Sequence, residues 1–345
     1  MSYLVVGAGN VGLATAALLI NDGYNVHLFS RRQLPLSESK TLQVSGNILQ
    51  GNFSLSTCTD DLEVIVKANG GKLPDRIAIA CRGNDIEAIA QLLYPYVTSD
   101  MSILLLCSAR FASLAFPKAL QRCGCPISNL PTVADVRTSP IVSRSNAIGQ
   151  VNLSAFKEVV RIAAPVPTMT ERVIKDFPTF SNLRGQYSYL GLSLAKLDDI
   201  VHIPLILTGW LAVESGQGHN IYRSATPSNS QLLEKMDDER LEVGKALKID
   251  LLNVCAAFHE SYGTVGDSVL EHFQQVKAFD NAIIQDPKHR YLYEDVAFGL
   301  CPLQALARAV HIKTPILDGA IALAYGLAKL PQPWQFTDND LLRLR

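Results

Sequence analysis

Three glycines near the N-terminus have the spacing of a loop that holds a dinucleotide. Residues 5–12 read Val-Val-Gly-Ala-Gly-Asn-Val-Gly, between a short apolar run and a helical pattern. In a GxGxxG loop the first glycine allows a tight turn, the second lets the backbone approach a pyrophosphate, and the third lets helix and strand pack closely. The N–H groups at the helix start then face the phosphates. We therefore predict that a dinucleotide is bound by Gly7, Ala8, Gly9, Asn10, Val11 and Gly12.

The end of the second apolar run indicates which dinucleotide is preferred. Ser30 stands where an Asp or Glu usually accepts hydrogen bonds from the adenosine ribose. Arg31 or Arg32 can pair with a 2′-phosphate, and such a hydrogen bond contributes about 1.5 to 3 kcal/mol. We expect NADP(H) to be preferred over NAD(H), and the alternative interpretation is two solvated surface arginines. His27 lies between apolar neighbours and is expected to be structural.

Three segments in the second half of the chain combine acids, bases and cations: residues 199–204, 236–240 and 289–300. A histidine imidazole ordinarily titrates near neutrality, so His202 is a candidate for passing a proton at physiological pH. Arg290 and Glu294 are four residues apart, so an ion pair on one helix face is an alternative to a binding role. Arg290 and Asp295 would not share a face of a continuous helix. We expect a bend between them, with a helix that starts near Tyr293.

With these segments the chain resembles the octopine/nopaline (opine) dehydrogenase family over nearly its whole length. The resemblance rests on the glycine motif, a His-x-Pro opening the helical half, an Asp-Glu-Arg helix, and an Arg-Tyr-Leu-x-Glu-Asp-Val segment followed by Thr-Pro at 314–315. Asp135, Pro140 and Arg144 have the spacing of an acidic-Pro-Arg element in the family. Residues 107–110, Cys-Ser-Ala-Arg, depart from the glycine-rich turn that the family usually has there.

The resemblance implies a reductive condensation. The amine of an amino acid, or a larger amine, and a 2-oxo acid form an imine, whose carbon takes a hydride from reduced nicotinamide to give a secondary amine dicarboxylate. The family's general acid/base histidine matches His202, and the aspartate that orients this ring matches Asp295. The arginine that grips the 2-oxo acid carboxylate matches Arg290, a task suited to a planar guanidinium. An NAD(P)-dependent oxidoreductase acting on a CH–NH bond is therefore implied.

Two other functions remain open from the residues alone. A reductase of similar two-domain plan would convert a 2-oxo acid to a 2-hydroxy acid without any amine. A non-catalytic nicotinamide-binding sensor would bind the cofactor tightly without turnover. The joint presence of His202, Arg290 and Asp295 favours catalysis over the sensor.

Other polar and aromatic residues have less specific contexts. Trp210 is expected to line the amino-acid pocket, with an interior aromatic as the alternative. A solvated helix face is the simplest interpretation of Asp237, Asp238, Glu239 and Arg240. Surface or supporting roles are expected for His219, His259, His272, His289 and His311.

The hydrophobic pattern predicts the elements that position these residues. Up to about residue 165, short β-branched runs alternate with helical stretches, as in a doubly wound parallel sheet, and from about residue 190 the periodicity is helical. Strands are predicted over 4–6, 26–29, 77–81, 103–107 and 159–162, a helix over 11–19 and an antiparallel hairpin over 41–58. Further helices are predicted over 230–247 and 251–262 and from Pro302 and Pro315.

These elements predict an α/β fold in two domains. We expect an N-terminal Rossmann-type doubly wound parallel sheet over residues 1–180 and an all-α helical-bundle domain over residues 181–345. The second domain should carry the substrate site, in a cleft next to the first.

Composition excludes several classes of function. Hydrophobic residues make up 48% of the chain and the net charge is −1, so no general basic field attracts nucleic acid or an anionic membrane. No apolar run approaches the roughly 18 residues of a membrane span, and no signal peptide is visible, so a cytoplasmic location is expected. The seven cysteines lack zinc spacing, so no metal is expected. The expected partners are a small-molecule amine and a 2-oxo acid, and a homodimer through residues 316–327 stays open.

Overall fold

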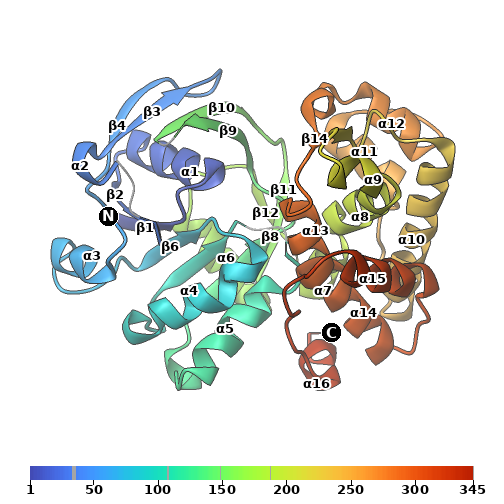
Figure 1. Cartoon of the computed structure of the whole chain (residues 1–345). Coiled ribbons are helices and arrows are strands. Elements are labelled where there is room, and N and C mark those ends of the chain that lie inside the picture. Colours follow the sequence, from blue (N-terminus) through green and yellow to red (C-terminus); the bar gives the residue numbers. More distant parts are fainter. Residues whose placement is uncertain (33–35, 107–108, 148, 187, 345) are drawn as a thin grey trace. The chain divides into compact units, whose positions relative to one another are not determined.

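The computed structural model of the chain describes residues 1–32, 36–106, 109–147, 149–186 and 188–344 (Figure 1). Its contacts divide the chain into two compact units, Met1–Leu192 and Ser193–Arg345. Cys107 and Ser108, the first half of the segment that departs from the family pattern, lie outside the described residues.

The first unit is built on a mostly parallel sheet. Among the described residues its order is β12-β11-β8-β7-β6-β1-β2-β5. The strands are β1 (Ser2–Val6), β2 (Asn25–Phe29), β5 (Thr57–Thr59), β6 (Arg76–Ile79), β7 (Ser102–Leu105), β8 (Thr132–Val136), β11 (Val160–Ala163) and β12 (Leu183–Gly185). Neighbours pair in parallel from β5 through to β8, while β8 and β11 are antiparallel. The strand order changes direction beside β1, which is the topological switch point where such sheets bind ligands. The Rossmann-type sheet is therefore confirmed.

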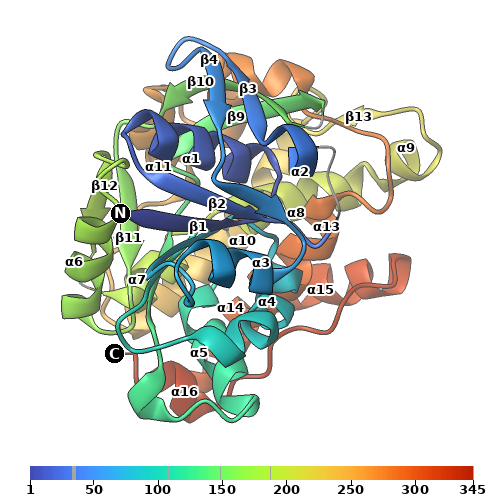
Figure 2. The ribbon, with the colours of Figure 1, turned by 90° about the vertical axis from the view of Figure 1, so that its left-hand side faces the viewer.

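Helices cover both faces of this sheet (Figures 1 and 2). On one face, Tyr3 and Val5 of β1 pack in an apolar cluster with α1 (Asn10–Asn21) and α6 (Pro167–Asp176). On the other face, α4 (Ile86–Leu93) and α5 (Ala112–Arg122) lie against each other. Alternate strand residues serve opposite faces, so each strand reads as a continuous apolar run. The shorter helices are α2 (Leu36–Ser39), α3 (Leu62–Ala68), η1 (Gly83–Asp85), η2 (Tyr94–Tyr96) and η3 (Ile127–Asn129).

A second sheet lies on the outer side of α1. Its order is β4-β3-β10-β9 among the described residues, formed by β3 (Thr41–Ser45), β4 (Gly51–Ser54), β9 (Ile141–Ala147) and β10 (Gln150–Phe156). The predicted hairpin is confirmed as the antiparallel pair β3 and β4. The last part of the predicted segment, β5, does not belong to the hairpin. It pairs with β2 in the main sheet. Figure 2 shows α1 between the two sheets, which explains why this helix is apolar on nearly all sides.

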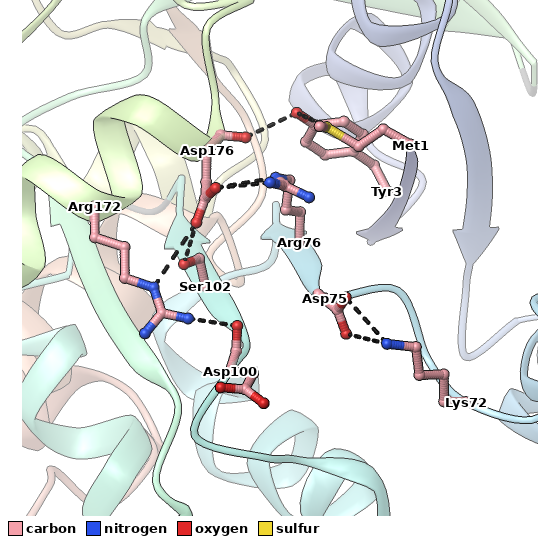
Figure 3. Close-up of polar contacts among 9 residues, drawn as sticks. All are labelled: Met1, Tyr3, Lys72, Asp75, Arg76, Asp100, Ser102, Arg172 and Asp176. Atoms are coloured by element: carbon pink, nitrogen blue, oxygen red, sulfur yellow. Dashed lines mark hydrogen bonds and ion pairs between the residues drawn. The ribbon is translucent and has the colours of Figure 1, made fainter.

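Polar contacts fasten the C-terminal end of α6 to the strand ends opposite the glycine loop (Figure 3). Asp176 Oδ1 lies 2.9 Å from Arg76 Nη2, and Asp176 Oδ2 accepts from the Ser102 hydroxyl at 2.6 Å. The Tyr3 hydroxyl donates to the Asp176 carbonyl at 2.8 Å. A carboxylate at a helix C-terminus is disfavoured by the helix dipole, and the pairing with Arg76 and Arg172 offsets this cost.

The second unit is helical apart from a short strand pair, β13 (His219–Asn220) with β14 (Ile283–Ile284). The buried helix α8 (Asp198–Thr208) packs against α10 (Pro227–Ala246), α13 (Arg290–Asp295) and α15 (Pro315–Leu327), as Figure 1 shows. The remaining helices are α9 (Trp210–Glu214), α11 (Val254–Tyr262), α12 (Val269–Gln275), η4 (Lys277–Asn281), η5 (Val296–Leu300), α14 (Cys301–Ala309) and α16 (Asp338–Leu342), and α7 (Tyr189–Leu194) crosses the unit boundary. The predicted helical bundle is confirmed. No helix of the described chain has both the length and the apolar character needed to cross a membrane.

The segment that holds Arg290 and Asp295 differs from the prediction. The helix begins at Arg290, not near Tyr293, because the His289 side chain caps it by accepting from the Tyr291 N–H at 3.3 Å. The chain stays helical through η5, a π-helical turn, into α14. Pro302 has no N–H for the α-helical bond pattern, which fits a widened turn immediately before it.

The interior of α10 overturns the solvated-face expectation for Asp237 and Arg240, whereas Asp238 is exposed as expected and Glu239 is half-buried. Asp237 and Arg240 are 2% and 1% exposed, and Arg240 Nε donates to Asp237 Oδ1 at 2.7 Å. Arg240 also donates to the carbonyls of Leu194 and Leu252, and Asp237 accepts from the Val254 N–H. For these two residues the expectation was wrong because their partners satisfy both charges inside the bundle, which the local charge pattern does not reveal.

Candidate functional site

The glycine loop after β1 is built so that only glycine fits at its first and third positions. Gly7 has a φ of +107°, and a Cβ there would lie 2.3 Å from the Ala80 carbonyl oxygen. A Cβ at Gly12 would lie 1.9 Å from the Gly7 carbonyl oxygen. A side chain at Gly7 would therefore collide with the backbone that follows β6, and one at Gly12 would push the start of α1 away from the loop.

The middle of the same loop has room for a ligand. Apart from its chain neighbours, no atom of the described residues lies within 4 Å of a Cβ placed on Gly9, which is the N-cap residue of α1. The first turn of α1 contains no acidic residue, so no carboxylate of that turn opposes an anion at the positive end of the helix dipole. Asn10 is held to the second sheet, because its amide donates to the Ser143 carbonyl at 3.3 Å. The residues present fit the pyrophosphate of a dinucleotide.

The end of β2 carries cations and no carboxylate of its own. Ser30 follows Phe29, and its hydroxyl accepts from the Arg32 N–H at 3.4 Å. Arg31 Nη2 lies 2.5 Å from Asp85 Oδ1, so a carboxylate reaches this place from η1 after β6. Arg32 is exposed. His27 is buried on β2 against the Thr57 hydroxyl at 3.0 Å, and burial lowers the pKa of His27.

In the second unit, α8 and α13 bring His202 and Asp295 into direct contact. His202 Nδ1 lies 2.7 Å from Asp295 Oδ2, and the two residues are 7% and 5% exposed. A Cβ on Gly299 would lie 2.7 Å from the Asp199 Cβ, so the glycine in η5 lets α8 approach this closely. The two residues are far apart in sequence and form one buried pair.

The other ring nitrogen of His202 is also engaged. Its Nε2 lies 2.9 Å from the Tyr222 hydroxyl, and Tyr222 is 5% exposed. An ionised Asp295 can only accept hydrogen bonds, so Nδ1 carries the proton and Nε2 accepts from Tyr222. This arrangement assigns the neutral Nδ1–H tautomer.

Tyr291 connects the His202 pair to Arg290. The ring of Tyr291 stacks on the His202 ring, with centroids 3.7 Å apart and an interplanar angle of 13°. The Arg290 guanidinium carbon lies 4.8 Å from the centroid of the same Tyr291 ring. Arg290 Nη1 also lies 3.7 Å from Glu294 Oε2, so the helix-face ion pair considered as an alternative exists, but it is long. The Arg290 side chain is 46% exposed.

Burial sets the protonation state of this cluster. It lowers the pKa of His202 to about 4, with Arg290 acting in the same direction and the carboxylates of Asp198, Asp199 and Glu294 opposing. Burial also raises the pKa of Tyr222 well above its usual value. At pH 7 the ring of His202 is therefore neutral and the Tyr222 hydroxyl is a proton donor.

Trp210 starts α9 directly after Gly209, and it is 7% exposed. Its indole N–H has no hydrogen-bond partner among the residues that the structure describes. An unpaired buried donor costs about 1 to 3 kcal/mol, which marks the group for a ligand or a water molecule.

Tyr222 and Tyr291 are the residues of this cluster that the sequence did not single out. Tyr291 lies inside the segment 289–300, where the stacking could not be foreseen. Tyr222 lies in a polar segment between α9 and α10 with no motif around it, and only the fold brings it to His202. In the described part of the chain, no group of three His, Cys, Asp or Glu side chains is arranged to hold a metal ion.

A Rossmann-type unit with a dinucleotide loop, followed by a helical unit with a buried His–Asp pair, defines a two-domain nicotinamide-dependent oxidoreductase. Residues 186–328 match the family model for the α-helical domain of NAD/NADP octopine/nopaline dehydrogenase. The opine dehydrogenase of Arthrobacter sp. (strain 1C) is 29% identical over 338 residues, which cover 94% of this chain and 90% of that protein. The chain is therefore similar to octopine/nopaline dehydrogenases, through the family model in its helical half and through an opine dehydrogenase over nearly its whole length.

Solved structures show the same fold. An octopine dehydrogenase with NADH and L-arginine superposes with a TM-score of 0.76 and 17% identity, covering 94% of this chain and 89% of that one. A yersinopine dehydrogenase with NADP⁺ superposes with a TM-score of 0.75 and 15% identity, covering 95% of this chain and 91% of that one.

Proposed function

We propose that the protein is an opine-type dehydrogenase, which joins an amine and a 2-oxo acid by reductive condensation at the expense of NAD(P)H. The observation that carries this proposal is the buried contact of 2.7 Å between His202 and Asp295, with Arg290 next to it through Tyr291. The hydroxy-acid reductase and the non-catalytic sensor are not favoured, because the relatives that match most of the chain include an opine dehydrogenase.

The chain's own residues divide the work of the reaction. Neutral His202 takes a proton from the attacking ammonium group and returns one as the imine is reduced, and Asp295 stabilises the imidazolium between these steps. Arg290 binds the 2-oxo acid carboxylate through the exposed edge of its guanidinium. The unpaired indole N–H of buried Trp210 is available to a polar group of the amine substrate.

A nicotinamide dinucleotide would be held by the loop from Gly7 to Gly12 and would supply the hydride when bound. We propose NADP(H) as the preferred form, with Arg31 and Arg32 at the 2′-phosphate. The support is that Ser30 replaces the usual carboxylate and that Arg32 is exposed. Asp85 is a competitor, because it already pairs with Arg31.

We also propose that two copies of the chain associate through α15. The support is that two large apolar side chains of this helix, Leu323 and Leu327, are 51% and 37% exposed. Sedimentation of the wild type and of a Leu323→Glu variant tests it, and a monomer at micromolar concentration would contradict it.

The function is tested by measuring NADPH and NADH oxidation with pyruvate, 2-oxoglutarate or oxaloacetate, each with and without a panel of amino acids. We expect oxidation only when both partners are present, with a product whose mass equals their sum less water plus two hydrogens. Oxidation with the oxo acid alone would support the hydroxy-acid reductase instead. Tight cofactor binding without oxidation, in all combinations, would support the sensor.

A further inference from the structure

The hydroxyl of Tyr222 occupies the only ring nitrogen of His202 that Asp295 leaves available. Nδ1 bonds Asp295 at 2.7 Å and Nε2 bonds Tyr222 at 2.9 Å. A neutral imidazole has one N–H and one lone pair, so both are used. Any proton that His202 gains in the proposed reaction must arrive at Nε2, where the Tyr222 hydroxyl already stands.

Packing holds Tyr222 in this place independently of His202. Its ring stacks on Phe279, with centroids 3.8 Å apart and an interplanar angle of 8°, and meets the edge of Phe273 at 5.0 Å. Its backbone N–H donates to the side chain of Asn220, which in turn is bonded to the carbonyls of Phe279 and Asp280. The hydroxyl is therefore preorganised toward Nε2 by the fold around η4.

His202 is held just as firmly from its own side. The Tyr291 ring covers one face at 3.7 Å, and the bond to Asp295 fixes the ring's rotation. Direct contact between a substrate and Nε2 would require the Tyr222 ring or the His202 ring to leave its packing. Transfer through the hydroxyl requires neither ring to move.

We propose that Tyr222 is the third member of a proton relay with His202 and Asp295, and that Nε2 exchanges its proton through the Tyr222 hydroxyl. This inference rests on the proposed opine dehydrogenase function. In one step the Tyr222 O–H bond breaks as the Nε2–H bond forms, while the phenol oxygen takes a proton from the substrate's ammonium group. Tyr222 ends neutral, the amine is free to attack, and the imidazolium is paired with Asp295. The reverse transfer returns the proton.

The test compares Tyr222→Phe with Tyr262→Phe. The first removes one hydroxyl and keeps the ring that stacks on Phe279, and the second removes one hydroxyl from the same aromatic cluster, where the Tyr262 ring lies 5.8 Å from Phe279. We expect Tyr222→Phe to lower kcat at least tenfold with little change in KM, and Tyr262→Phe to leave both within twofold. If Nε2 instead meets the substrate directly, removing the hydroxyl frees it, and an unchanged or higher kcat would overturn the relay.

A second measurement does not depend on turnover. Nitrogen-15 NMR of the histidine side chains, with His202 assigned from a His202→Gln variant, reports its tautomer and pKa. We expect the Nδ1–H tautomer in the wild type, and a higher His202 pKa in Tyr222→Phe, because a hydrogen bond to the neutral form disfavours protonation. An Nε2–H tautomer, or the same pKa in both proteins, would overturn the inference even if opine synthesis is observed. Absence of opine synthesis with the expected NMR result would instead contradict the proposed function alone.

Discussion

At the scale of single residues, the protein combines one titratable base with partners that keep it neutral. Burial lowers the pKa of His202 to about 4, while the charged groups around it come from its own helix, as Asp198 and Asp199, and from α13, as Arg290, Glu294 and Asp295. At pH 7 the ring is therefore neutral and has one nitrogen lone pair that can accept a proton. Its pKa also makes the folded state sensitive to acid.

Replacing His202 by Gln tests two properties of this residue, its role as a proton acceptor and its effect on stability in acid. We expect kcat to fall at least a hundredfold while NADPH affinity stays within twofold, because the side chain does not lie in the dinucleotide loop. A loss of only a few fold would remove His202 from the acid/base role.

The same variant tests the pH dependence of stability. In the unfolded chain the histidine titrates near 6.5, and in the folded chain its pKa is lowered to about 4, so the unfolded state binds more protons between these values. Stability contributed by neutral His202 is present above about pH 6.5 and is lost as the pH falls toward 4. Urea unfolding at pH 7 and 5 should show a smaller loss on acidification in His202→Gln than in the wild type, and equal losses would contradict the lowered pKa.

At the scale of elements, the site depends on how closely η5 approaches α8. A Cβ on Gly299 would lie 2.8 Å from Asp199 Oδ2 as well as 2.7 Å from its Cβ. The π-helical turn and its glycine therefore bring α13, with Asp295, alongside His202. π-helical turns are frequent at functional sites because they change the direction of the side chains that follow and precede them.

Gly299→Ala and Gly319→Ala form a matched pair, since both glycines lie in helical segments of the second unit. We expect Gly299→Ala to destabilise the protein by about 1 to 3 kcal/mol through overpacking. A Cβ placed on Gly319 would meet no atom within 4 Å from the rest of the described chain outside its own helical turn, so Gly319→Ala should stabilise α15 by about 0.5 to 1 kcal/mol. Denaturant unfolding measures both, and a neutral effect of Gly299→Ala would show that α8 and η5 can separate without cost.

At the scale of the whole molecule, the net charge of −1 supplies no general attraction for an anionic cofactor. Recognition of a 2′-phosphate must come from local groups, and Arg31 and Arg32 are next to Ser30 at the end of β2. Arg31 already has Asp85 as a partner, so Arg32 is the stronger contributor to this proposal.

Replacing Arg31 and Arg32 together by Ala should weaken NADPH binding at least tenfold and NADH binding less than threefold. The expected loss corresponds to one or two charge-assisted hydrogen bonds of about 1.5 to 3 kcal/mol each. Fluorescence titration with both cofactors measures it, and equal losses for the two would contradict the phosphate assignment.

Much of this organisation could be predicted from the chain alone. The glycine spacing, the β-branched runs and the later helical periodicity are local patterns, and each follows from short-range sterics or from the period at which apolar residues must face a core. The residues His202, Arg290 and Asp295 stand out by type and by family resemblance, without any coordinates.

Only the tertiary structure decided which groups meet. Tyr222 reaches His202 because the segment between α9 and α10 folds back over η4, and Asp237 with Arg240 is buried because distant carbonyls and an N–H complete its hydrogen bonds. Contacts of this kind join residues that no local period relates. Their free energy arises from burial and partner satisfaction, which exist only once the helices have packed.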